Sequence, residues 1–141
     1  MGFKHCFSFL CFLSFLLSLG CGTEGPPLQP VEGSVSYLDK KLKNGSIVFV
    51  PMGNLPSSVG IIDSNGKFKM KTRINGVDRE GAPIGEHKVM IISIQDTTGR
   101  LPEDRAPLPP PNIPMHYGDT SLSNLTAKVE DKTNLINFDL K

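Results

Sequence analysis

The sequence contains no tryptophan and only two tyrosines, so it offers few aromatic rings on which bases or sugars could stack. It also lacks an excess of charge of one sign, because 15 Lys and Arg residues stand against 14 Asp and Glu residues. Nucleic-acid-binding domains usually carry a basic patch, and we see no basic stripe along the chain. We therefore expect no nucleic-acid partner.

Cysteine is scarce as well, and all three cysteines lie within the first 21 residues. An uncharged apolar run over residues 6–19 follows a short head that carries Lys4. These 14 residues are fewer than the roughly 20 that a membrane-spanning helix needs, and the layout is typical of a secretory signal peptide. Small Gly20 directly precedes Cys21, which predicts a lipobox with cleavage between the two and lipid attachment to Cys21.

Cleavage there would remove Cys6 and Cys11, and the lipid would occupy Cys21, so no cysteine would remain for a disulfide, a metal or nucleophilic catalysis. More than one acyl chain gives stable attachment to a membrane. We predict a lipoprotein that is anchored in the bacterial cell envelope through Cys21, on the periplasmic or outer-membrane face.

The sequence predicts three segments: a signal peptide (residues 1–20), a lipidated Cys21 with a tether (21–30), and one folded domain (31–141). Residues 22–30 (GTEGPPLQP) are rich in proline and glycine and should be extended, with a reach of at most about 28 Å. The 121 residues that follow cleavage suffice for one domain with its own core.

Short runs that alternate between apolar and polar residues, separated by turn residues, predict strands with one buried face. Asp63-Ser64-Asn65-Gly66 is the clearest turn, because Asn and Gly accept the positive φ that hairpins require. Residues 72–85 read as irregular. We predict seven strands, near residues 31–37, 47–50, 59–62, 67–71, 87–94, 125–130 and 136–140.

The long segment 95–124 holds six of the twelve prolines, and Pro109, Pro110 and Pro111 should form a stiff polyproline II stretch. Two interpretations are open. The segment covers the apolar outer side of the 87–94 strand as a lid, with Ile113 and Tyr117 packed beneath it. Alternatively, Pro109, Pro110, Pro111 and Tyr117 form a contact surface for a partner protein.

Seven short phrases follow one another in the chain: VEGSV (31–35), NGSIVFVP (44–51), DSNGKF (63–68), PIGEHKV (83–89), IPMHYGD (113–119), LTAKV (125–129) and NFDL (137–140). In this order and behind a lipobox, they resemble small bacterial lipoproteins with a carboxypeptidase regulatory-like domain. The resemblance implies an all-β fold, a seven-stranded antiparallel Greek-key sandwich of the transthyretin (prealbumin) type. It implies no activity, because a fold by itself does not define one.

His87 and His116 are the two histidines that would remain after cleavage, and neither lies in a cluster with the spacing of metal ligands. We expect both to be structural, His87 half-buried and His116 solvated. Enzymes of the transthyretin-like fold, the 5-hydroxyisourate hydrolases, end in Tyr-Arg-Gly-Ser, whereas this chain ends in Phe138-Asp139-Leu140-Lys141. We therefore predict no enzyme, no metal and no cofactor.

The expected function is that of a non-catalytic, lipid-anchored structural or protein-binding module, with the membrane and another envelope protein as partners and no small-molecule ligand. One alternative is an accessory carbohydrate-binding module, which would need an exposed aromatic ring such as that of Tyr117. Another is a hydrolase of the same fold, which would need a cleft that brings His87 and His116 together.

Overall fold

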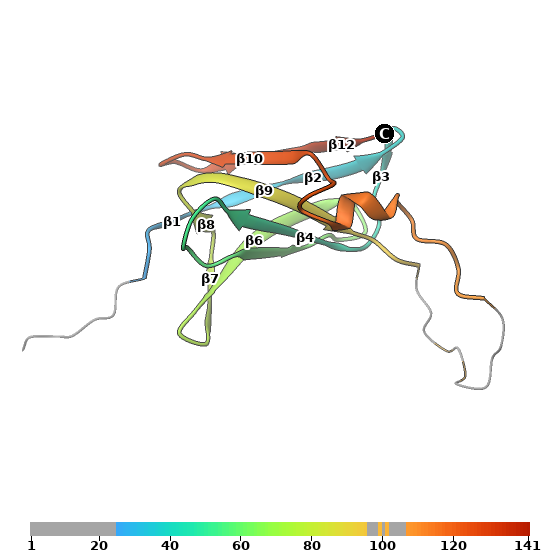
Figure 1. Cartoon of the computed structure of the whole chain (residues 1–141), viewed down its shortest axis with the longest axis horizontal. Helices are drawn as coiled ribbons and strands as arrows, with labels where there is room; N and C mark the ends of the chain where they lie inside the picture. Colours follow the sequence, from blue (N-terminus) through green and yellow to red (C-terminus); the bar gives the residue numbers. More distant parts are fainter. Residues whose placement is uncertain (1–24, 96–98, 100, 102–106) are drawn as a thin grey trace, which may run out of the picture.

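The structure is a computed structural model, and it describes residues 25–95, 99, 101 and 107–141. This part of the chain is built from β-strands and one 3₁₀ turn, η1 (Met115–Gly118), as the all-β prediction requires. The main sheet has the strand order β10-β9-β4-β5-β6-β2-β11, and β3, β7 and β12 pair with strands of this path. Strands β1 and β8 form a separate pair (Figure 1).

The strands span β1 Leu28–Gln29, β2 Val31–Tyr37, β3 Lys40–Lys41, β4 Ser46–Pro51, β5 Ser58–Ile61, β6 Lys67–Ile74, β7 Val77–Glu80, β8 Ala82–Pro83, β9 Gly85–Ile92, β10 Leu125–Val129, β11 Asn134–Leu135 and β12 Phe138–Leu140. All seven predicted strand positions are occupied. Strand β12 occupies only residues 138–140 of the last one, which was predicted at 136–140, and β11 at residues 134–135 lies before it.

The sheet curls over so that two of its distant strands meet across the core. Phe49 lies on β4 and Phe138 on β12, with β5, β6 and β2 between them in the pairing order. Their rings nevertheless contact edge to face, with centroids 6.1 Å apart, and Phe138 also lies 6.4 Å from the ring of Phe68. The inner face of the sheet therefore forms one apolar core.

Alternation in the sequence determines which side chains face this core. On β6, Phe68 and Met70 are buried, whereas Lys67, Lys69 and Lys71 are exposed, as predicted. The predicted turn before β6 is confirmed as well: Oδ1 of Asp63 accepts the backbone N–H groups of Asn65 and Lys67, at 2.8 and 2.9 Å.

The sheet is antiparallel as predicted, with one exception: the short strands β11 and β12 run parallel to β2. The prediction for the segment after β6 is wrong. Residues 72–85 are not irregular, because β6 and β7 form a hairpin there. Its turn residues Asn75 and Gly76 have φ of 52° and 80°, the left-handed conformation that a two-residue hairpin turn needs.

The tether predicted for residues 21–30 also differs from the structure. Within its described part, Leu28 and Gln29 form β1 and pair with Pro83 and Ala82 of β8. The folded domain therefore begins before β2, because the segment that precedes this strand already pairs with β8.

A polar network holds the long 95–124 segment where it leaves and rejoins the sheet. Both Oγ of Ser93 and Nδ2 of Asn112 donate to Oδ1 of Asn44, at 2.8 and 2.9 Å, and the backbone N–H of Asn112 donates to the carbonyl of Ser93. The lid interpretation holds in part: Ile113 is buried in the core, but Ile94 on the outer side remains 66% exposed.

Replacement of Phe138 tests the closure of the sheet. We expect Phe138→Ala to lower the free energy of unfolding by about 3–5 kcal/mol, because it removes a buried ring that packs against Phe49 and Phe68. The measurement is thermal and urea unfolding. Leu135→Ala, at an exposed position of the neighbouring strand β11, is the matched control and should leave stability nearly unchanged. Equal losses in the two variants would contradict the assignment of Phe138 to the core.

Candidate functional site

The predicted lipidation site lies outside the described residues, since Gly20 and Cys21 precede Gly25. Cleavage before Cys21 and its lipidation therefore stay predictions. Among the residues that the structure describes, no helix is long and apolar enough to cross a membrane.

The predicted partner-contact residues do not behave alike. Pro110 and Pro111 are exposed and Pro109 is half-buried, so this stretch is accessible to another molecule. Tyr117 is only 8% exposed, and its hydroxyl group donates to the carbonyl of Lys141 at 2.8 Å. The backbone N–H of Lys141 donates back to the same hydroxyl oxygen at 3.2 Å. Tyr117 thus fixes the last residue of the chain to η1 and cannot present its ring to a partner or a sugar.

The two histidines lie apart, at opposite ends of β9. His87 is near the start of this strand, whereas η1, which carries His116, packs beside Ile91 and Ile92 at its end. Four residues of a strand correspond to about 13 Å, so the two rings do not form a common site. In the described chain, no three His, Cys, Asp or Glu side chains are placed to hold a metal ion.

His87 is fully buried rather than half-buried as predicted. Its ring lies 5.7 Å from that of Phe49, and its Nδ1 is 3.0 Å from the carbonyl oxygen of Gly85. Because a carbonyl oxygen only accepts, Nδ1 carries the proton in the neutral ring, and Nε2 has no hydrogen-bond partner. Burial lowers the pKa of His87, although the carbonyl of Gly85 and the charge of Glu86 act in the opposite direction.

Two aspartates with lowered pKa hold turns. Hydrogen bonds from the backbone N–H groups of Lys67 and Asn65 lower the pKa of Asp63. The hydroxyl and backbone N–H groups of Ser121 do the same for Asp119. Each carboxylate is stabilised in its charged form by the loop that it organises, which is the opposite of what a general acid requires.

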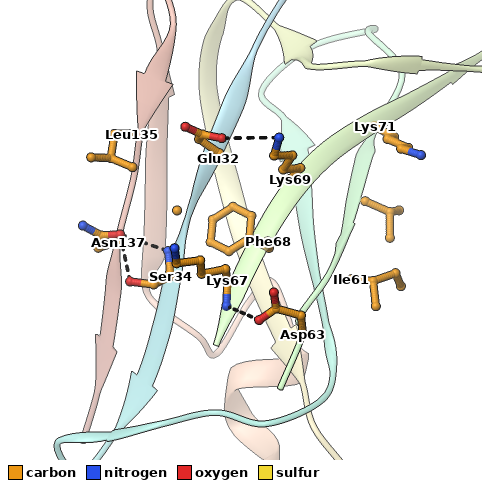
Figure 2. A pocket seen from close by; sticks show the side chains of 12 residues that line it. Glu32, Ser34, Ile61, Asp63, Lys67, Phe68, Lys69, Lys71, Leu135 and Asn137 are labelled. Carbon is orange, nitrogen blue, oxygen red and sulfur yellow. Dashed lines mark hydrogen bonds and ion pairs between the residues drawn. The ribbon is translucent and has the colours of Figure 1, made fainter. Parts of the chain in front are cut away.

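A concave surface lies on the outer face of the sheet, across β5, β6, β2 and the C-terminal segment. This outer-face groove has a volume of about 660 Å³. In Figure 2, Ile61 and Leu135 lie on opposite sides of it, with Lys67 and Lys69 between them and Lys71 on the side of Ile61. Both Ile61 and Leu135 are 72% exposed, so the groove presents apolar surface to the solvent.

Charged and polar side chains surround these apolar residues. Nζ of Lys69 lies 3.9 Å from a carboxylate oxygen of Glu32, whereas Lys67 and Lys71 form no ion pair within 4 Å in the described part of the chain (Figure 2). The backbone N–H and the hydroxyl group of Ser34 both donate to Oδ1 of Asn137 at 2.9 Å, which joins the C-terminal segment to β2. The groove thus combines apolar walls with a small excess of positive charge, because three lysines of β6 stand against the carboxylates of Glu32 and Asp63.

Sequence reasoning missed this groove. The sequence predicts a short strand at residues 59–62, and in the structure Ser58 and Gly60 point inward whereas Val59 and Ile61 point outward. That pattern leaves two β-branched apolar side chains on the outer face, which is the signal that could have located the surface. The contribution of Leu135 depends on the parallel pairing of β11, and no local pattern in the sequence reveals it.

The chain was compared with protein-family models, with curated proteins and with solved structures, and none of them matched it.

The burial of His87 predicts a dependence of stability on pH. The unfolded chain takes up a proton near the usual pKa of 6.5, whereas folded His87 resists protonation. The contribution of His87 to the free energy of unfolding should therefore be fully present above this pH. It should decrease as the pH falls below it, by at most about 1.4 kcal/mol per pH unit. Unfolding measured between pH 7.5 and 5.5 should show a smaller slope for His87→Leu than for the wild type.

His116→Ala, at the exposed histidine of η1, is the matched control and should keep the wild-type slope. An unchanged slope in His87→Leu would contradict the assignment of the proton uptake to His87.

Proposed function

We propose that this chain is a non-catalytic lipoprotein of the bacterial cell envelope, anchored through Cys21, whose β-domain binds another envelope protein. The observation that carries the binding function is the outer-face groove, where Ile61 and Leu135 are largely exposed around the lysines of β6. An exposed apolar surface with polar residues at its edge is typical of a protein-binding site. The lipobox supports the location.

The roles of the titratable side chains support binding rather than catalysis. His87 is buried beside Phe49, and Asp63 and Asp119 stabilise turns by accepting hydrogen bonds from their own loops. Perturbed pKa values point to a catalytic site when the groups converge on a cleft. Here each of the three belongs to a separate structural feature.

For the fold, we propose the seven-stranded Greek-key sandwich of the transthyretin-like, carboxypeptidase regulatory-like type. The positions of β2, β4, β5, β6, β9, β10 and the β11–β12 pair support seven principal strands. In this proposal β1, β3, β7 and β8 are short additions, and the parallel pairing of β12 with β2 brings the last strand beside the first.

The occupant that fits the outer-face groove is an extended protein segment with apolar and acidic side chains. Ile61 and Leu135 offer apolar contact, and the lysines of β6, which outnumber the two lining carboxylates, favour acidic side chains. The carbohydrate alternative has less support, because Tyr117 is buried and Tyr37 is half-buried.

The anchor is tested by replacing its cysteine. We expect Cys21→Ser to abolish incorporation of labelled palmitate and to leave the precursor uncleaved or release the protein from the membrane, because lipid is attached through the thiol group. Cell fractionation and mass spectrometry of the purified protein measure both effects. Cys11→Ser, within the predicted signal peptide, is the matched control and should be processed normally. A Cys21→Ser protein that is still lipid-labelled would refute the anchor.

The groove is tested by placing negative charges on its apolar walls. We expect Ile61→Glu combined with Leu135→Glu to lower the amount of a cross-linked envelope partner at least about tenfold, because buried carboxylates would replace apolar contacts near acidic residues of the partner. The measurement is cross-linking in intact cells followed by purification of the lipoprotein from detergent-solubilised envelopes.

Leu122→Glu is the matched control, since Leu122 is similarly exposed but lies outside the groove. Failure to capture any partner, or equal capture by the groove variant and this control, would count against the proposed function.

A further inference from the structure

The segment that precedes β2 is packed against the domain. Leu28 pairs with Pro83 and Gln29 with Ala82, and Nε2 of Gln29 donates to Oδ1 of Asp131. The backbone of Gly81 lies so close that a Cβ there would be 2.5 Å from the carbonyl oxygen of Gln29. Gly81 is itself held from the core, because the hydroxyl group of buried Thr72 donates to its carbonyl oxygen at 2.7 Å.

Contact with the domain begins even earlier, at Gly25. A Cβ at this residue would lie 2.8 and 2.9 Å from two side-chain carbons of Ile74, which is only 7% exposed. Ile74 is the last residue of β6, at the β6–β7 hairpin. From Gly25 onward, the chain therefore follows this hairpin and β8 until it enters β2.

This packing shortens the link between Cys21 and the domain. Four residue steps separate Cys21 from Gly25, and a fully extended chain spans at most about 14 Å over that distance. A free tether as far as residue 30 would reach about twice as far. The length of the link, together with the place where it joins the domain, restricts which part of the surface can lie near the membrane.

We propose that the end of the anchored domain formed by the β6–β7 hairpin lies against the lipid surface. The opposite end, where the Pro-rich residues 107–114 lie, points away from the membrane. The proposal rests on the lipid anchor of the proposed function and adds the orientation of the domain. It commits to one occupant of the hairpin end, the membrane that holds the lipid of Cys21.

The direction of the strands places the two ends far apart. Strands β2 and β9 both start next to the β1–β8 pair and run away from it, and the seven residues of β2 span about 20 Å. The Pro-rich segment follows the far end of β9, and β12 pairs with the last residues of β2. Figure 1 shows β1, β8 and the hairpin at one end of the domain, and the C-terminus and the orange 107–114 segment at the other.

The composition of the hairpin shows what kind of contact this is. Val77 beside the turn is 59% exposed, Arg73 pairs with Asp78 at 3.7 Å, and Arg79 and Glu80 carry opposite charges. Lys71 pairs with Glu80 in the strand register, so residues 71–80 carry a net charge of only +1 and attract anionic lipids weakly. The short link between Cys21 and Gly25, and not charge attraction, keeps the hairpin close to the membrane. The orientation should therefore persist at high salt and on uncharged phosphatidylcholine.

The test uses the natural lipoprotein with single fluorescent labels. Because the only cysteine of the mature chain would carry the lipid, Val77→Cys and Pro110→Cys each provide a unique labelling position. The purified proteins are reconstituted in phosphatidylcholine vesicles that carry a nitroxide quencher on the lipid headgroups. We expect several-fold stronger quenching of the Val77→Cys label than of the Pro110→Cys label, unchanged by high salt.

A longer link provides the control. Insertion of about twelve Gly and Ser residues between Glu24 and Gly25 should remove most of the difference while the protein still floats with the vesicles. The same insertion between Gly53 and Asn54, in an exposed loop, should leave the difference intact.

The outcomes separate the inference from its premise. Equal quenching at both labels, or a difference that survives the insertion before Gly25, overturns the orientation and leaves the lipid anchor standing. Protein that fails to float with the vesicles overturns the anchor, and the orientation with it.

Discussion

The edge-to-face contact between Phe49 and Phe138 is the constraint on which the rest of the structure depends. These rings come from strands that are far apart in the sheet order, so their contact requires the sheet to curl until its inner face closes. Burial of an aromatic side chain contributes about 1.5–3 kcal/mol, with a further term for the ring pair. The same closure seals His87 beneath Phe49 and brings the C-terminal strand to where Tyr117 can hold it.

Hydrogen bonds of buried and half-buried polar groups fix the peripheral segments to the sheet. The hydroxyl group of Thr72 contacts that of Ser58 at 2.7 Å and donates to the carbonyl of Gly81, whose backbone packs against Gln29 of β1. At the other end, Asn44 accepts hydrogen bonds from Ser93 and Asn112. Since a buried polar group without a partner costs about 1–3 kcal/mol, each network strongly favours one arrangement of the segment that it holds.

Inner and outer faces of the sheet thus have separate roles. The inner face supplies the stability, and its buried residues are mostly apolar. On the outer face, Val59, Ile61 and Leu135 are exposed to solvent instead of buried in the core. They line the groove that we propose as a protein-binding surface. The groove lies along strands that lead from the hairpin end to the far end of the domain. If the hairpin end stands on the membrane, the groove faces sideways, toward neighbouring proteins of the same membrane.

The sequence by itself determined the all-β class, the approximate positions of the principal strands and the inward residues of β6, because alternation and turn chemistry act over only a few residues. The Asn75-Gly76 turn was equally local, and it could have been found in the same way. Only the tertiary structure decided that β12 runs parallel to β2, that His87 and Tyr117 are buried, and that β1 joins β8. These features arise from contacts between residues far apart in the chain, where burial in a shared core, and not local preference, sets the lowest free energy.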